Sequence, residues 1–243
     1  MQKVTLKIFT LFIFLLIANI ISGQSSNVEK FKNDLVILKN TFETKYPSLY
    51  RFSNKTSIDK LFEDCLLSVN KKTTERDFYR IIKLILSKIE DGHLGCSPSN
   101  TLVKTFNEKE KYFPLSLYFL DKRAFVDCSS INSLPSGTEI LEINSKAINN
   151  IRQTLFNYIV SDGKIETKKY WILKHSFWFY YNLVYGQQEK FKVKYKDIHG
   201  KISFLIVNSD FKKNIECKSL TDKEESKLLD IKYPNANTAI LTI

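Results

Sequence analysis

The chain is poor in the residues that interrupt regular structure. Its 243 residues include only seven glycines and five prolines. This is too few for a linker-rich or disordered protein. Hydrophobic residues make up 43% of the sequence and aromatic residues 13%, which is ample for a packed core. The composition therefore indicates a folded protein of one large domain or two small ones.

A compact cluster of Lys and Arg is also missing, although the formal net charge is +11. A strongly basic protein could bind nucleic acid or an acidic membrane surface. Here the basic residues are nearly all lysines, and they are spread along the chain and mixed with acidic residues. This pattern favours a solvated, lysine-rich surface, and we expect no nucleic-acid partner.

The sequence has no zinc-binding pattern, because its four cysteines include no C-x-x-C pair. We expect no metal and no cofactor. Four cysteines allow three complete pairings, and the sequence does not choose among them. The simplest interpretation is that most of them are buried thiols, and a bridge between Cys65 and Cys96 is the alternative. The other two cysteines are Cys128 and Cys217.

The N-terminus has the pattern of a secretory signal peptide. Lys3 and Lys7 precede a mostly apolar run over Ile8–Ile21, and a small-residue exit at Ser22 and Gly23 follows it. As a helix the run would span about 21 Å, which is short of a hydrocarbon core of about 30 Å. We predict that residues 1–23 are a signal peptide. The protein would then be exported to the periplasm, the cell surface or the extracellular space, without stable membrane insertion after cleavage. An uncleaved membrane anchor is the alternative.

The region over residues 27–105 is predicted to be a helical domain. Apolar residues recur there every three or four positions in three segments, as on the buried faces of helices. Ser57 is expected to be the N-cap of the second helix, and Thr74 with Asp77 a capping pair for the third. Gly92 is expected to end the third helix in the left-handed conformation.

From Tyr112 onward the hydrophobic period changes from 3.6 to two, which is typical of strands. Glu139–Ile143 reads as a short strand. The segment Lys168–Gly186 is dense in aromatic residues. This pattern favours an amphipathic packing segment, and a substrate groove is the alternative. Two hairpins are predicted, with turns at Asp121-Lys122 and at His199-Gly200.

This order of segments resembles the tail-specific (C-terminal processing) serine peptidases, in the exported form common in Bacteroidetes. The Asp-Gly-His motif also resembles the tricorn-like branch of that family. Three stretches carry the resemblance, which are "KIEDGH" (Lys88–His93), "LPSGTEILEIN" (Leu134–Asn144) and "SDGKIETKKY" (Ser161–Tyr170). The resemblance implies an α+β fold with an N-terminal helical domain and a PDZ-like β-rich domain over residues 108–208. Residues 209–243 would be a linker and the first strand of a truncated α/β catalytic domain.

The same resemblance implies a catalytic mechanism. In the family a serine on the α/β domain attacks the peptide carbonyl, a base removes its proton, and backbone N–H groups hold the oxyanion. The position that matches the histidine base is His93, and an imidazole suits the role because its ordinary pKa is near 6.5. Asp91 would orient His93 or merely cap the turn. His93 as a structural turn residue is the alternative. His175 and His199 read as packing and hairpin-turn residues.

Two departures from the family pattern bear on function. Leu94 follows the motif histidine where the family usually has Thr. The stretch that corresponds to the peptide-binding loop, Phe113–Leu117, contains Pro114 and no glycine, and proline removes one backbone donor. The PDZ-like domain is therefore expected to gate or scaffold rather than to grip a substrate terminus.

We expect the chain to be the N-terminal regulatory and substrate-handling part of an exported serine endopeptidase that acts on polypeptides. No glycine flanks a serine in a nucleophile-elbow pattern, so the chain alone is expected to be inactive. Thr238–Ile243 reads as a strand with nothing to cover it, which favours a truncated chain. The alternative is a non-catalytic exported module that binds peptides or proteins.

Overall fold

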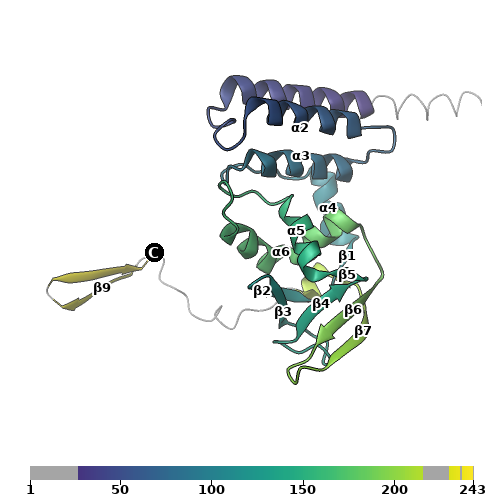
Figure 1. Cartoon of the computed structure of the whole chain (residues 1–243), viewed down its shortest axis with the longest axis vertical. Coiled ribbons are helices and arrows are strands. Elements are labelled where there is room, and N and C mark those ends of the chain that lie inside the picture. The colour runs from purple at the N-terminus through teal and green to yellow at the C-terminus, as the bar shows by residue number, and fades with distance from the viewer. Residues whose placement is uncertain (1–26, 216–229, 236, 243) are drawn as a thin grey trace, which may run out of the picture.

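The computed structural model describes residues 27–215, 230–235 and 237–242 (Figure 1). The predicted signal peptide lies outside these residues. Helices gather in the N-terminal part and antiparallel strands follow, which confirms the α+β class. Within the described residues, no helix combines the length and the apolar character that crossing a membrane would need.

Three helices form the N-terminal region and lie side by side in Figure 1. They span residues 27–45, Lys55–Ser68 (α2) and Glu75–Ile89 (α3). Each contributes apolar residues to one core, which includes Leu35, Phe62 and Ile85, all fully buried. The three predicted helices are therefore confirmed.

The helix ends follow the predictions in part. Thr74 and Asp77 form the expected capping box at the start of α3. Ser57 was expected to be the N-cap of α2, and this was wrong. Asn54 is the N-cap, and its side chain accepts a hydrogen bond from the backbone N–H of Ser57 at 2.8 Å. Asn54 stands one residue before the first helical residue, where its side chain can reach the unpaired N–H groups of the first turn.

A fourth helix, α4 (Asn100–Glu108), was not predicted. Ser99 is its N-cap and accepts a hydrogen bond from the backbone N–H of Leu102 at 3.1 Å. Leu102 and Phe106 are its buried residues and form a small cluster with Tyr79. The helix thus joins the N-terminal helices to the β-rich region.

The β-rich region is built on a six-stranded antiparallel sheet, in the order β2-β3-β4-β6-β7 with β5 paired to β4. The two predicted hairpins are confirmed, as is the strand over Glu139–Ile143. Asp121 and Lys122, at the first turn, both have positive φ, at 48° and 66°, which is the geometry of a tight hairpin turn. The strands of the sheet are β2 (Ser116–Leu120), β3 (Arg123–Cys128), β4 (Glu139–Ile143), β5 (Lys146–Ala147), β6 (Lys190–Lys196) and β7 (Ile202–Asn208).

Short pairs of strands complete the described fold. β1 (Lys111–Tyr112) pairs with β8 (Asp210–Phe211), which α7 (Lys212–Ile215) follows. The predicted C-terminal strand is present as β10 (Thr238–Thr242). The expectation that it lacks a partner was wrong, because β9 (Asp230–Asn235) pairs with it in an antiparallel hairpin.

Two helices cover one face of the sheet, α5 (Ile148–Phe156) and α6 (Thr167–Tyr185). The aromatic residues of α6 pack into the core, which confirms the packing interpretation of this segment. The ring of Phe113 lies 5.6 Å from that of Phe177 and 5.2 Å from that of Phe191, both in edge-on geometry, the arrangement that aromatic pairs prefer.

The cysteines divide into two kinds. Cys65 and Cys96 are free thiols, so the alternative of a bridge between them was wrong. Cys128 is disulfide-bonded. Cys217 lies outside the described residues.

Candidate functional site

The turn that follows α3 carries both predicted site residues. The expectation that Gly92 ends this helix in the left-handed conformation was wrong, because Glu90 takes that conformation, with φ 60° and ψ 31°. The loop between α5 and α6 holds Glu90 there. Its carbonyl accepts a hydrogen bond from the backbone N–H of Gly163 at 2.8 Å, and the Lys164 ammonium contacts its carboxylate. These contacts offset the cost that a non-glycine residue has at positive φ.

Asp91 is buried, with 7% of its surface exposed, and both of its carboxylate oxygens are engaged. Oδ2 accepts a hydrogen bond from the Tyr46 hydroxyl, and Oδ1 accepts one from the backbone N–H of His93 at 2.9 Å. These two bonds, the first more than the second, hold the pKa of Asp91 below its ordinary value. Burial raises the pKa of Tyr46 to about 12, and the bond to Asp91 acts in the same direction. The contacts of Asp91 thus fix the backbone of the turn.

Gly92 lies against the loop between α5 and α6. Its backbone N–H donates to Oδ1 of Asp162 at 2.9 Å, across 70 residues of sequence, and the Lys168 ammonium donates to its carbonyl. A Cβ atom on Gly92 would lie 2.8 Å from Oδ2 of Asp162, so glycine allows the close approach. Two of the stretches that carried the family resemblance, Lys88–His93 and Ser161–Tyr170, therefore contact each other in the fold.

His93 is exposed on this fixed backbone. In the part of the chain that the structure describes, its imidazole makes no hydrogen bond. A solvent-facing imidazole on a rigid turn can accept or donate a proton to a group brought to it from outside. The other two histidines lie elsewhere. Nδ1 of His175 lies 2.8 Å from the carbonyl oxygen of Trp171 within α6, and His199 occupies the turn between β6 and β7.

Sequence reasoning missed two residues of this site, Tyr46 and Asp162. Tyr46 precedes Pro47 at the end of the first helix, and Asp162 stands in an Asp-Gly pair, a turn signal. Neither pattern says which distant backbone or side chain each residue contacts. Among the described residues, no group of three His, Cys, Asp and Glu side chains is placed to hold a metal ion.

The stretch that corresponds to a peptide-binding loop is part of the core. Phe113, Leu115 and Leu117 are fully buried. Aromatic rings fill the space between β2 and α6, where Phe119 lies 5.9 Å from Phe177 between ring centroids. This side of the sheet is therefore packed against the helix.

Two cavities of the described region lie away from the turn. The larger holds about 480 Å³ and borders α4 and α7. The smaller holds about 240 Å³ and is lined mainly by aromatic side chains, including Tyr79, Phe106 and Trp178. His93 of the candidate site lies on an exposed turn, apart from both of these cavities.

No protein-family model and no curated protein matches this chain. Among solved structures, the chain is similar to CPAF, a chlamydial tail-specific-protease-like serine protease. Mature CPAF complexed with lactacystin is 13% identical with a TM-score of 0.55, over 75% of this chain and 35% of the CPAF chain. Mature CPAF alone is 12% identical with a TM-score of 0.52, over 75% and 34% of the two chains. The likeness shows a related fold, and the match spans about a third of the CPAF chain.

Proposed function

We propose that the chain is the N-terminal, substrate-handling part of an exported serine endopeptidase of the tail-specific kind. The observation that carries this proposal is the fold, because the described helical and β-rich regions together resemble part of a serine protease of that kind. The three sequence stretches that resemble the family support it independently. Its substrate would be a polypeptide, and the β-rich region would be PDZ-like in topology but act as a scaffold.

In this proposal His93 is the general base. Its backbone is anchored through Asp91 to Tyr46, and the neighbouring Gly92 is anchored to Asp162. A base must be held in place to take a proton from a nucleophile in the reactive geometry. Asp91 would act as a positioning residue through the backbone N–H of His93 rather than through its ring.

The nucleophilic serine would come from outside the described residues and approach the exposed imidazole. Export rests on the signal-peptide pattern of residues 1–23 and would bring the protein to polypeptides outside the cytoplasm. The same pattern supports a mature protein without stable membrane insertion.

The test uses the protein as its source cells make it. Its ends are determined by intact-mass and terminal-peptide mass spectrometry, and it is then treated with a fluorophosphonate probe and assayed on denatured proteins. We expect labelling at a serine and hydrolysis. His93→Gln should lower kcat by about 10²–10⁴. His199→Gln, an exposed histidine in a hairpin turn, is the matched control and should leave kcat unchanged.

Full activity in His93→Gln would contradict the role of His93. A mature protein that neither reacts with the probe nor hydrolyses any substrate, yet binds polypeptides, would favour the alternative of a non-catalytic exported binding module. The packed surface between β2 and α6 implies that such binding would use another face of the β-rich region.

A further inference from the structure

The outer strand of the sheet, β7, has one edge that no described strand covers. It stands at the end of the strand order, and within the described residues only β6 pairs with it (Figure 1). All seven of its residues pair with β6 without a register shift. Protected edges usually carry a charge, a proline or a bulge. The stretch Ile202–Asn208 has no charged residue and no proline, so the strand is regular and itself carries none of these protections.

The backbone groups at this edge can be assigned from two hydrogen bonds. The N–H of Ser209 donates to the carbonyl of Glu189 at 2.8 Å, and the N–H of Asp197 donates to that of Lys201 at 3.0 Å. Hydrogen-bonded pairs alternate with non-bonded pairs along an antiparallel ladder. The odd-numbered residues of β7 therefore turn their backbone groups toward β6, and the even-numbered residues turn theirs toward the opposite edge.

The same even-numbered residues expose apolar side chains. Ile202, Phe204 and Ile206 are 54%, 57% and 66% exposed, and they share one face because side chains alternate along a strand. A row of three large apolar side chains beside outward-facing N–H and C=O groups matches what an added strand contacts. We call these three residues, with their backbone edge, the β7 edge.

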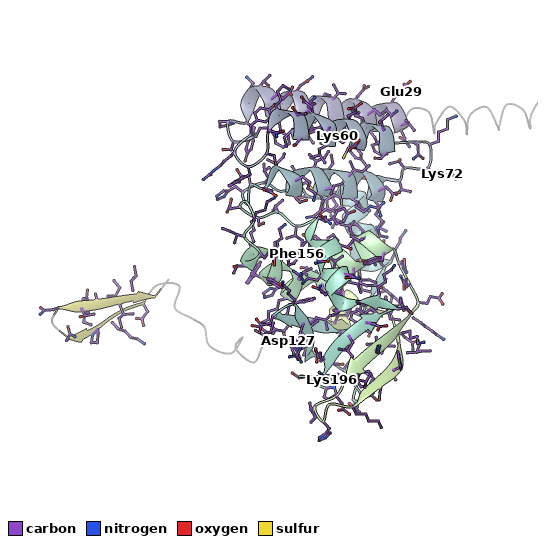
Figure 2. All side chains as sticks on the ribbon, in the orientation of Figure 1. Glu29, Lys60, Lys72, Asp127, Phe156 and Lys196 are labelled. Atoms are coloured by element: carbon purple, nitrogen blue, oxygen red, sulfur yellow. The ribbon has the colours of Figure 1, made fainter. Side chains whose placement is uncertain are left out.

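Lysines border the β7 edge along the neighbouring strand. The β6 residues that pair with the three apolar residues of the β7 edge are all lysines. Nζ of one of them, Lys192, lies 5.1 Å from the centre of the Phe204 ring. Lys194 and Lys196 form ion pairs of 2.8 Å with Glu142 and Glu139, and Figure 2 labels Lys196.

Two lysines at the Asn208 end of the β7 edge differ from Lys194 and Lys196 in their ion pairing. Lys192 lies opposite Ile206 and Lys190 opposite Asn208, and neither forms an ion pair with a described residue. These two positive charges at the Asn208 end favour a partner that carries a carboxylate there. A second copy of the chain would add Ile202–Asn208 itself, which contains no carboxylate.

We propose that the β7 edge docks an extended polypeptide segment as an additional strand. The segment has apolar side chains at alternate positions, and it has a carboxylate at the end beside Asn208. There the carboxylate can meet the Lys190 and Lys192 side chains, which extend across β7 from the neighbouring strand β6. In antiparallel pairing the Asn208 end of β7 faces the N-terminal end of the segment, so the acidic residue comes first. In parallel pairing the acidic residue comes last. This inference is independent of the proposed catalytic role, because it uses none of the residues of the turn after α3.

The test measures binding of fluorescent peptides to the full chain by anisotropy. The probes are Glu-Thr-Val-Thr-Val-Thr-Val, its reverse, and a copy of each with Lys in place of Glu. One of the two Glu peptides should bind, and its orientation identifies the pairing direction. The matching Lys peptide should bind at least about tenfold more weakly. N-methylation should abolish binding where it removes the N–H groups that face β7, without changing the protein. These are the valine N–H groups of the Glu-first peptide in antiparallel pairing, and the threonine N–H groups of its reverse in parallel pairing.

Protein variants locate the site. Phe204→Ser should weaken binding by about tenfold. Tyr118→Ser is the matched control, since Tyr118 is 42% exposed on β2, the other edge strand, and it should bind like the parent. Four results would each overturn the proposal. These are no saturable binding below about 1 mM peptide, equal binding of Glu and Lys peptides, binding unchanged by N-methylation at the positions that face β7, and a dimer in sedimentation that Phe204→Ser dissociates.

Discussion

Substitution of Arg76 by Met should destabilise the fold, because Arg76 connects the helical region to the β-rich region. Arg76, near the start of α3, makes two hydrogen bonds to the carboxylate of Glu110, at 3.0 and 2.9 Å. It also donates to Oδ1 of Asn182 on α6. Asn182 in turn donates to Glu110 at 3.1 Å and to the carbonyl of Lys111 at 3.2 Å. This cluster joins α3, the segment after α4, and α6.

The expected magnitude follows from burial. The Glu110 side chain is only 7% exposed and that of Arg76 is 23% exposed. Removal of one partner of a buried pair costs about 3–5 kcal/mol, because the other charge stays buried without its partner. We expect the lower end, about 3 kcal/mol, because Nε of Arg76 already lacks a hydrogen-bond partner. For a protein of this size that lowers Tm by about 6–12 °C.

The assay is urea unfolding followed by circular dichroism, with thermal melts alongside. The control is Lys194→Met, which breaks a half-exposed ion pair to Glu142 and should cost less than about 1 kcal/mol. The double variant Arg76→Met with Glu110→Leu should be more stable than Arg76→Met alone, because it removes the orphaned carboxylate. If Arg76→Met costs no more than the control, the assignment of this cluster as the joint between the regions is wrong.

Three further predictions concern single groups. Tyr46→Phe should cost about 1.5–3 kcal/mol at neutral pH. Since Asp91 has a folded pKa below its unfolded value, its contribution is present above the unfolded pKa and disappears as pH falls through the folded pKa. The variant should therefore lose less stability on acidification than the parent, and an equal loss would refute this. Asn54→Ala should cost about 1 kcal/mol and Ser57→Ala only a few tenths, and the reverse order in urea melts would overturn the cap assignment. Burial raises the pKa of the Cys65 thiol to about 11, so iodoacetamide at neutral pH should leave it unmodified in native protein and alkylate it after unfolding, as peptide mass spectrometry can show.

Features encoded within a few residues were predictable from the sequence. The capping box at Thr74 and Asp77 needs only its own first turn, and the hairpin turn at Asp121-Lys122 is set by polar residues between two alternating stretches. The alternation also predicted which segments become strands. Helix α4 was missed because it is short and its apolar residues, such as Leu102, are too few for a periodic signal.

Features that depend on contacts between distant segments were not predictable. Local rules favour glycine at the end of a helix, and Gly92 was therefore expected there. The backbone N–H of Gly163 and the ammonium of Lys164, more than 70 residues away, hold Glu90 in that conformation instead. In the same way, the sequence points to His93 through a resemblance, but it gives no indication that Asp162 fixes the neighbouring backbone.

The position of Glu90 has a consequence for protein engineering. Because α3 ends through contacts from the loop between α5 and α6, the two regions cannot be exchanged as independent modules. A chimera that joins this helical region to a foreign β-rich region would lose the partner of Glu90, and the last turn of α3 would fray into solvent. Transplanting the turn that bears His93 therefore requires moving the segment around Gly163 with it.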